Sequence, residues 1–376
     1  MIKVGIPTEI KAHESRVAAT PETVKKMIAL GCQVLVQKGA GERANISDQA
    51  YQTAGAELVS VKAVFQTDVM LKVRAPEISE IKAMSAGNVL IGLLEPYNLT
   101  QLKVIAQQGI TAFALEALPR NSRAQSMDVL SSQANVAGYK AVLLASHFYQ
   151  RFMPMLMTSA GTVKAARVLI LGAGVAGLQA IATAKRLGAV VEASDVRPAV
   201  KEQVESLGAK FLDVPYETAE EKDIAAGTGG YARPMPASWM ARQATIVAQR
   251  VAEADIVICS ALIFGQEPPI LVHAETVAMM KAGSVIIDMA AGFGKNGCGN
   301  CPLTLANEAV VNHGVTIVGY TNLPSLVAAD ASAFYARNIL EFMKLLILEG
   351  KFNIPTDDEL ISATLMCKDG KQIEHK

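Results

Sequence analysis

A glycine-rich turn between an apolar run and a helical pattern constrains the fold of this chain more than any other feature. The run Val168–Leu171 is typical of a buried strand, and Gly172-Ala173-Gly174-Val175-Ala176-Gly177 follows it directly. A helical pattern then continues to Leu187, and a second apolar run ends at Asp195. A strand, a glycine turn and a helix in this order predict the opening unit of a doubly wound parallel sheet that binds a dinucleotide.

The three glycines of the turn have separate physical tasks at such a site. Gly172 allows the tight turn, Gly174 lets the backbone approach a pyrophosphate, and Gly177 lets the helix pack closely on the strand. The pyrophosphate would lie at the helix N-terminus, where free N–H groups and the helix dipole favour an anion.

An acidic residue at the end of the second strand favours NAD over NADP. Asp195 can accept hydrogen bonds from ribose hydroxyls and would repel a 2′-phosphate. Val196 and Arg197 follow it, and the positive charge of Arg197 weakens that preference without reversing it.

Strand and helix patterns alternate along the whole chain. This alternation predicts an α/β fold of two Rossmann-like domains, each a doubly wound parallel sheet with helices on both faces. The expected strands are Ile2–Ile6, Cys32–Val36, Val69–Val73, Val89–Leu93, Thr111–Leu115, Val168–Leu171, Val190–Ala193, Lys210–Leu212, Ile256–Ser260, Val285–Asp288 and Thr316–Val318.

Two long helical patterns, at Ser131–Phe152 and Pro324–Leu348, predict helices that join the two domains. The first domain is then discontinuous, residues 1–130 with 322–376, and the dinucleotide-binding domain, residues 131–321, is inserted within it. The cleft between such domains is the expected active site.

Two polar segments interrupt the pattern. Tyr216–Met240 predicts a long loop with a mobile tip at Tyr231, either functional or a tolerated insertion. Pro119–Gln133 is rich in hydrogen-bonding groups, and it also leaves two interpretations open. If it faces the cleft, Arg120 and Asp128 can pair while Gln125 and Ser131 bind a carboxamide or ribose; otherwise Ser126 or Asp128 only caps a helix.

Charged residues follow the expected N-terminal strands, where open parallel sheets place ligand-binding groups. Glu9, Glu14 and Arg16 follow the first strand, and Lys72 ends the third. They are either binding groups or surface charges around a turn, and the surface interpretation is favoured for the nearby His13. Asn322 follows the last strand, at the edge where a nicotinamide would lie.

Composition excludes other classes of function. With 35 basic and 35 acidic residues and 5% aromatics, the chain has neither the charge nor the stacking surface of a nucleic-acid-binding protein. No apolar run reaches the roughly 18 residues of a membrane span, so a soluble chain is expected. The five cysteines suit a reducing compartment, and Cys298-Gly-Asn-Cys301 is interpreted as two loop thiols rather than a zinc or redox site. No metal site is expected.

Several segments together resemble the alanine dehydrogenase/pyridine nucleotide transhydrogenase family. They are GIPTEIKAHESRVAATP, RAQSMDVLSSQANVAGY, the glycine turn, GGYA and YTNLPS, and the resemblance extends over nearly the whole chain. RAQSMD is specific to the transhydrogenase branch. That branch implies an Si–Re (AB-specific) enzyme that transfers hydride between NAD(H) on this chain and NADP(H) on a partner beta subunit.

The resemblance also implies partners and residue roles. The chain would be a homodimer on the cytoplasmic side of the inner membrane, coupled to proton translocation by a membrane-spanning subunit. Residues that position the nicotinamide ring would be Arg120, Gln125, Asp128 and Ser131. Residues that hold the nucleotide would be Gly172, Gly174, Val175, Ala176, Gly177, Asp195, Val196, Arg197, Tyr231 and Asn322.

One position separates the two branches of the family. Alanine dehydrogenases use a catalytic histidine, with an arginine and a lysine for pyruvate, and the positions matching these three are Leu93, Arg16 and Lys72. Leucine cannot exchange a proton with a substrate, so an alanine dehydrogenase remains only the alternative function.

Overall fold

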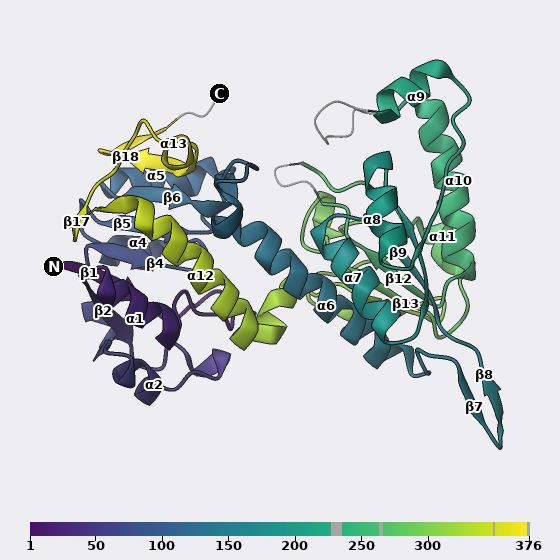
Figure 1. Cartoon of the computed structure of the whole chain (residues 1–376), viewed down its shortest axis with the longest axis horizontal. Coiled ribbons are helices and arrows are strands. Elements are labelled where there is room, and N and C mark those ends of the chain that lie inside the picture. Colours follow the sequence, from purple (N-terminus) through teal and green to yellow (C-terminus); the bar gives the residue numbers. More distant parts are fainter. Residues whose placement is uncertain (227–234, 263–265, 349, 374–376) are drawn as a thin grey trace. The chain divides into compact units, whose positions relative to one another are not determined.

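The computed structural model of the chain describes residues 1–226, 235–262, 266–348 and 350–373. The chain forms two compact units, which we call unit 1 (Met1–Gln133 with Pro324–Lys376) and unit 2 (Ala134–Leu323). Each unit contains a mainly parallel sheet with helices beside it (Figure 1). The predicted α/β class is thereby confirmed.

The sheet of unit 1 has eight strands in the order β19-β18-β6-β5-β4-β1-β2-β3. Its first six strands are parallel and follow the doubly wound order 3-2-1-4-5-6, whereas the two C-terminal strands are antiparallel. The strands are β1 Ile2–Ile6, β2 Cys32–Gln37, β3 Glu57–Val59, β4 Val69–Leu71, β5 Val89–Gly92, β6 Thr111–Ala114, β18 Leu365–Lys368 and β19 Lys371–Gln372.

Both faces of this sheet are buried, which is why its strands are apolar without alternation. Val69 and Leu71 belong to one core cluster, which α12 completes, whereas Met70 points into a second cluster with Ile81 and Ile105. The helices of unit 1 are α1 Pro21–Ala29, α2 Asp48–Thr53, α3 Val61–Val64, α4 Ile78–Ala83, α5 Leu99–Gln107, α12 Ala328–Leu346 and α13 Glu359–Thr364.

The sheet of unit 2 repeats the same order with seven strands, β11-β10-β9-β12-β13-β15-β14. Only the edge strand β14 is antiparallel. The strands are β9 Arg167–Leu171, β10 Val190–Ser194, β11 Lys210–Phe211, β12 Ile256–Cys259, β13 Val285–Asp288, β14 Ala309–Asn312 and β15 Val315–Val318. The helices are α7 Val175–Arg186, α8 Lys201–Ser206, α9 Ala219–Ala226, α10 Ala237–Glu253 and α11 Ala274–Ala278.

Two long helices lie near the unit boundaries. α6 (Val129–Tyr149) contains the first boundary, after Gln133. A short 3₁₀ segment, Leu323–Val327, contains the second boundary, and α12 follows it within unit 1.

The segment expected to be one long loop, Tyr216–Met240, is partly helical, so that prediction is wrong for its described part. Thr218 Oγ1 accepts a hydrogen bond from the amide of Glu221 at 3.1 Å and so caps α9. Arg242 of α10 then binds the Glu221 carboxylate at 2.7 Å. The spacing Thr218-x-x-Glu221 is a capping signal that the sequence analysis missed. Tyr231 lies outside the described residues.

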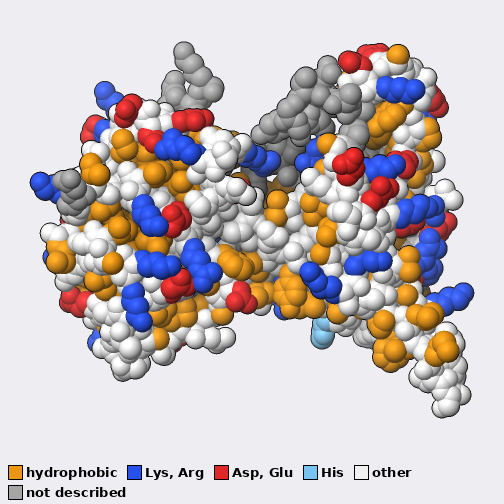
Figure 2. Space-filling view, viewed as in Figure 1, with side chains coloured by type: hydrophobic (Ala, Val, Ile, Leu, Met, Phe, Trp, Pro, Cys, Tyr) orange, Lys and Arg blue, Asp and Glu red, His pale blue; other side chains and the backbone are white. Residues whose placement is uncertain are grey.

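A two-stranded hairpin of β7 (Leu156–Thr158) and β8 (Gly161–Val163) projects from unit 2 (Figure 1). Hydrophobic side chains gather near it (Figure 2), where Phe152, Met155 and Met157 are 58%, 61% and 75% exposed. Within the described residues, no helix combines the length and hydrophobicity that crossing a membrane requires.

Candidate functional site

The glycine turn between β9 and α7 is close-packed at its two ends. Gly172 has φ +96°, a conformation that side chains disfavour. A Cβ atom on Gly177 would lie 1.9 Å from the carbonyl oxygen of Gly172, so α7 can approach the end of β9 only with glycine there. Ser260, which follows β12, fixes the turn by donating its hydroxyl to that same carbonyl at 2.9 Å.

The middle of the turn is open by comparison. A Cβ atom on Gly174 would meet nothing closer than Nη2 of Arg197, at 4.0 Å. Gly174 is the N-cap of α7, and no side chain caps that helix start within the described residues. The first amides of α7, at the exposed Val175 and half-buried Ala176, therefore have no side-chain partner there, and the geometry fits a bound anion such as a pyrophosphate.

Asp195 links the turn to the end of β10. Its Oδ2 accepts the amide of Ala173 at 2.8 Å, and its two oxygens also accept Nε and Nη2 of Arg197, each at 2.9 Å. The amide of Arg197 binds Oδ1 at 2.8 Å. These four donors occupy the roughly four lone-pair positions of the carboxylate. A ribose diol can bind Asp195 only if Arg197 releases part of this contact. The hydrogen bond to Asp195 also raises the pKa of the Arg197 guanidinium.

A cavity of about 210 Å³ adjoins Asp195, and the sequence analysis missed it. Its wall includes Val196, Phe211 and Leu212 together with Tyr216 and Trp239, whose rings stack with centroids 6.4 Å apart. Trp239 is 4% exposed, and its Nε1 donor has no hydrogen-bond partner among the described residues. The lining is suited to a planar aromatic ring that carries a hydrogen-bond acceptor. The lone tryptophan of the chain was the available signal.

In unit 1, the polar segment brings Asp128 and Ser131 together. The Asp128 carboxylate accepts the Ser131 amide at 2.9 Å and its hydroxyl at 2.5 Å, and it thereby caps α6. Arg120 and Gln125 are exposed. The expected ion pair between Arg120 and Asp128 does not form among the described residues, because Asp128 turns toward the helix start. The helix-cap interpretation therefore describes Asp128 in this structure.

Other residues of the same segment anchor it within unit 1. Arg123 pairs with Asp358, and Asn338 of α12 donates its amide to the Ser126 carbonyl at 2.7 Å. Ser132 binds the side chain of the same asparagine at 2.7 Å. These contacts hold the backbone between Arg120 and Asp128 in place and leave the exposed side chains able to meet a ligand.

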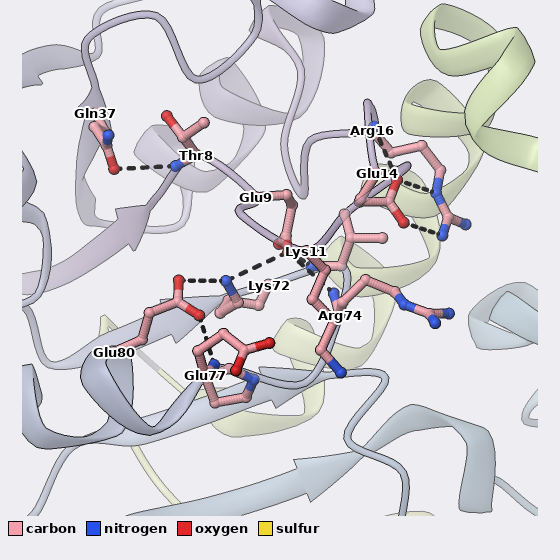
Figure 3. A network of polar contacts seen from close by, with 12 residues as sticks. Thr8, Glu9, Lys11, Glu14, Arg16, Gln37, Lys72, Arg74, Glu77 and Glu80 are labelled. Atoms are coloured by element: carbon pink, nitrogen blue, oxygen red, sulfur yellow. Dashed lines mark hydrogen bonds and ion pairs between the residues drawn. The ribbon is translucent and has the colours of Figure 1, made fainter. Parts of the chain in front are cut away.

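The charged residues that follow the N-terminal strands form two buried clusters (Figure 3). In one, Lys72 Nζ lies 2.6 Å from Glu80 and 3.3 Å from Glu9. In the other, Arg16 forms a two-pronged contact with Glu14, at 2.8 and 2.6 Å, and donates to Gln133 at 2.7 Å.

The surface interpretation of these charges is therefore wrong for all four residues that the sequence analysis named, and His13 alone is exposed. Glu9, Glu14, Arg16 and Lys72 are at most 3% exposed. Burial raises the pKa of Glu9, against the opposing charge of Lys72. The clusters satisfy each other's charges, so Arg16 and Lys72 already have anionic partners inside the fold.

A further acidic side chain, Glu116, lies beside the end of β5 and was missed. Its Oε1 accepts the amide of Glu95 at 2.7 Å, while its buried Oε2 has no hydrogen-bond partner among the described residues. Burial raises the pKa of Glu116 to about 7. Leu93, the first residue after β5, is half-buried and offers no titratable group.

The structure thus gathers two sets of predicted residues, each within its own unit. The glycine turn, Asp195, Val196 and Arg197 meet in unit 2, and the half-buried Asn322 follows β15 in the same unit. Arg120, Gln125, Asp128 and Ser131 lie on one segment of unit 1.

Comparison with known proteins places the chain in a family. The N-terminal domain of the family described as alanine dehydrogenase/PNT matches residues 5–137, and its C-terminal domain matches residues 141–375. The chain belongs to the alanine dehydrogenase/pyridine nucleotide transhydrogenase family. The resemblance that the motifs indicated is confirmed, and with it the assignment to NAD-binding oxidoreductases with a Rossmann-like fold.

Individual relatives come from both branches of this family. The first of the separate parts of NAD(P) transhydrogenase subunit alpha from Rhodospirillum rubrum is 46% identical over 387 residues, which covers 98% of this chain and 97% of the relative. The crystal structure of transhydrogenase from Sinorhizobium meliloti has a TM-score of 0.89 at 44% identity, covering 99% of this chain and all of that one. An L-alanine dehydrogenase structure has a TM-score of 0.80 at 26% identity, covering 99% and 97%.

Proposed function

We propose that this chain is the NAD(H)-binding subunit of a proton-translocating NAD(P)+ transhydrogenase. The observation that carries the proposal is Leu93 at the end of β5, where the family resemblance assigns the catalytic histidine of alanine dehydrogenases. A leucine cannot act as an acid or base, whereas direct hydride transfer between two nicotinamides needs neither. The greater identity to transhydrogenase relatives than to the alanine dehydrogenase structure supports the same choice.

The residues of unit 2 would hold the dinucleotide. The amides at the start of α7 would bind its pyrophosphate, and Asp195 would accept the ribose hydroxyls once Arg197 releases part of its contact. The cavity beside Val196, Tyr216 and Trp239 would take the planar base. Tyr231 would close over the nucleotide, and Asn322 would lie near the nicotinamide.

The residues of unit 1 would orient the reacting ring. Bound NAD(H) would supply or accept the hydride, in exchange with NADP(H) on the partner subunit. Arg120 and Gln125 would fix the nicotinamide, and Asp128 with Ser131 would hold its carboxamide or ribose. Their task is to bring the two rings to near-attack distance, on the order of 3–3.5 Å, and to exclude water.

The proposed partners are a second copy of the chain, an NADP(H)-binding beta subunit and a membrane-spanning subunit. The chain would then be peripheral on the cytoplasmic side of the inner membrane. The name of the Rhodospirillum rubrum relative, which makes it one portion of a subunit alpha, supports a multi-subunit enzyme. The exposed hydrophobic side chains near the β7–β8 hairpin support a subunit contact.

Reconstitution tests this function directly. The chain is mixed with an NADP(H)-binding transhydrogenase subunit, and reduction of the acetylpyridine analogue of NAD+ by NADH is followed with NADP(H) present. We expect turnover only in the mixture. Oxidation of L-alanine by the chain alone would overturn the proposal in favour of an alanine dehydrogenase. NADH binding without hydride transfer in any mixture would overturn it in favour of a nucleotide-binding protein without chemistry.

Variants of the polar segment test the roles within that function. Arg120→Ala and Gln125→Ala should each slow hydride transfer by more than they weaken NADH binding, because they orient the ring. Arg123→Ala is the matched control, since Arg123 lies on the same segment but pairs with Asp358. Equal losses of rate and affinity would make Arg120 and Gln125 ordinary binding residues.

A further inference from the structure

The loop after β13 folds around one buried carboxylate, Asp288. Oδ2 of Asp288 accepts the amides of Asn300 and Cys301 at 2.9 and 3.1 Å and the hydroxyl of Thr304 at 2.8 Å, while Oδ1 accepts the amide of Ala290 at 3.0 Å. This arrangement fixes the backbone of the turn that contains the pair Cys298 and Cys301.

The two cysteines lie at the ends of one tight turn. The amide of Cys301 donates to the carbonyl of Cys298 at 3.3 Å, and a turn closed this way brings its terminal Cα atoms within about 7 Å. Disulfides join Cα atoms over roughly the same range. Gly299 within the turn has φ +60°, and a Cβ atom there would lie 2.7 Å from both oxygens of Asp288. The turn is therefore held in this form by the fold, not by the cysteines.

The two thiols differ in access, as an entry thiol and a buried thiol should. Cys298 is half-buried, whereas Cys301 is 0% exposed. Burial raises the pKa of Cys301 to about 11, and the nearby Cys298 adds to that shift. Hydrogen bonds from Leu303 and Thr304 oppose it and would stabilise the Cys301 thiolate once it forms.

We propose that Cys298 and Cys301 form a reversible disulfide by exchange with a small disulfide such as glutathione disulfide. The Cys298 thiolate attacks one sulfur of glutathione disulfide, forms a mixed disulfide and releases one glutathione. The Cys301 thiolate then attacks the Cys298 sulfur and releases the second glutathione. Two protein thiols are oxidised, one glutathione disulfide is reduced, and the two protons go to the two glutathione molecules.

The position of this thiol pair gives the bond a consequence for the rest of unit 2. The side chain of Asn300, between the two cysteines, donates to the carbonyls of Ala261 and Pro269 at 2.9 and 2.8 Å. Ala261 follows Ser260, whose hydroxyl fixes the glycine turn. The disulfide would therefore stiffen a loop that contacts the support of that turn. The proposal is independent of the function proposed above, because its readout is the state of the thiols.

Thiol counting tests the proposal on the folded, full-length chain. After incubation with glutathione disulfide, we expect two of the five thiols to be lost, with tandem mass spectrometry locating a bond between Cys298 and Cys301. Retention of all five thiols, a wild-type product that stops at mixed disulfide, or a bond from Cys301 to Cys259 would each overturn it.

Variants separate the two thiols. Cys298→Ser should slow thiol loss by about tenfold or more, because the remaining thiol is buried and protonated. Cys301→Ser, or Cys301→Ala if the serine variant does not fold, should leave Cys298 as a lasting mixed disulfide with glutathione. Cys32→Ser is the matched control and should keep the two-thiol loss. Unchanged loss in Cys298→Ser would exclude Cys298 as the entry thiol.

Discussion

At the scale of single residues, the buried Lys72 is the most consequential charge in unit 1. Lys72→Met would leave Glu9 and Glu80 buried without a cation, which costs about 3–5 kcal/mol of unfolding free energy. Urea unfolding measures the loss, with the exposed Lys82→Met on neighbouring α4 as control. Adding Glu80→Gln to Lys72→Met should recover part of the stability. A Lys72→Met variant as stable as the control would show that the cluster is solvated.

Glu116 makes the stability of unit 1 depend on pH. Its folded pKa of about 7 lies above the ordinary value of 4.5, so the folded state holds the proton more tightly than the unfolded state. The contribution of Glu116 to stability is therefore highest below pH 4.5, falls as the pH rises from 4.5 to 7, and is then constant, with a total loss of up to about 3 kcal/mol.

Glu116→Gln should abolish this particular loss, because the amide does not ionise. Between pH 5 and pH 8 the urea midpoint should fall less for the variant than for the wild-type chain, and the variant should be the more stable of the two at pH 8. The exposed Glu42→Gln serves as control and should keep the wild-type profile. An unchanged profile in Glu116→Gln would show that Glu116 is ionised well below pH 7 in the folded state.

At the scale of elements, the strand–turn–helix unit of β9 and α7 separates folding from binding. Gly177→Ala should destabilise the fold by about 1–3 kcal/mol or more, because its Cβ would overlap the Gly172 carbonyl. Gly174→Ala should fold normally, since its Cβ has open space, but should weaken NADH binding by about tenfold or more by blocking the approach of the pyrophosphate. Thermal unfolding and NADH titration distinguish the two variants. Wild-type affinity in Gly174→Ala would place the pyrophosphate elsewhere.

The start of α6 permits a similar separation at Asp128. Asp128→Ala removes the cap and should cost about 1–2 kcal/mol, whereas Asp128→Asn keeps an N-cap acceptor and most of the stability. If Asp128 also holds the nicotinamide, Asp128→Asn will slow hydride transfer in the reconstituted system while its melting temperature stays near the wild-type value. Full activity in this variant would reduce Asp128 to a helix cap.

Elements with a strong local signal were predictable from the sequence, and elements without one were not. Thr20 caps α1 with Pro21 at its first position, and Ser47 caps α2, as their sequence patterns indicate. The short edge strands β3, β14 and β18 escaped prediction because tertiary pairing, rather than their own composition, makes them strands. The burial of Lys72 escaped for a related reason, since its partners Glu9 and Glu80 are brought to it only by the folded sheet.

At the scale of the whole molecule, the two units share one strand order but differ in how their chains are closed. Unit 2 is built from a single continuous stretch, whereas unit 1 contains both ends of the chain. The sequence predicted this interrupted course because a second βα series begins before the first region has its last helix. It did not predict the buried charged clusters of unit 1 or the cavity beside Asp195, which depend on side-chain directions.

The pairing of β18 with β6 also sets an order in time. Every residue of unit 2 leaves the ribosome before β18 does, so β6 waits with an open edge while a complete second unit is synthesised. Open strand edges are sites of misassociation, and the last residues made are the ones that cover this edge. The region of the protein that is begun first is therefore the region that is finished last.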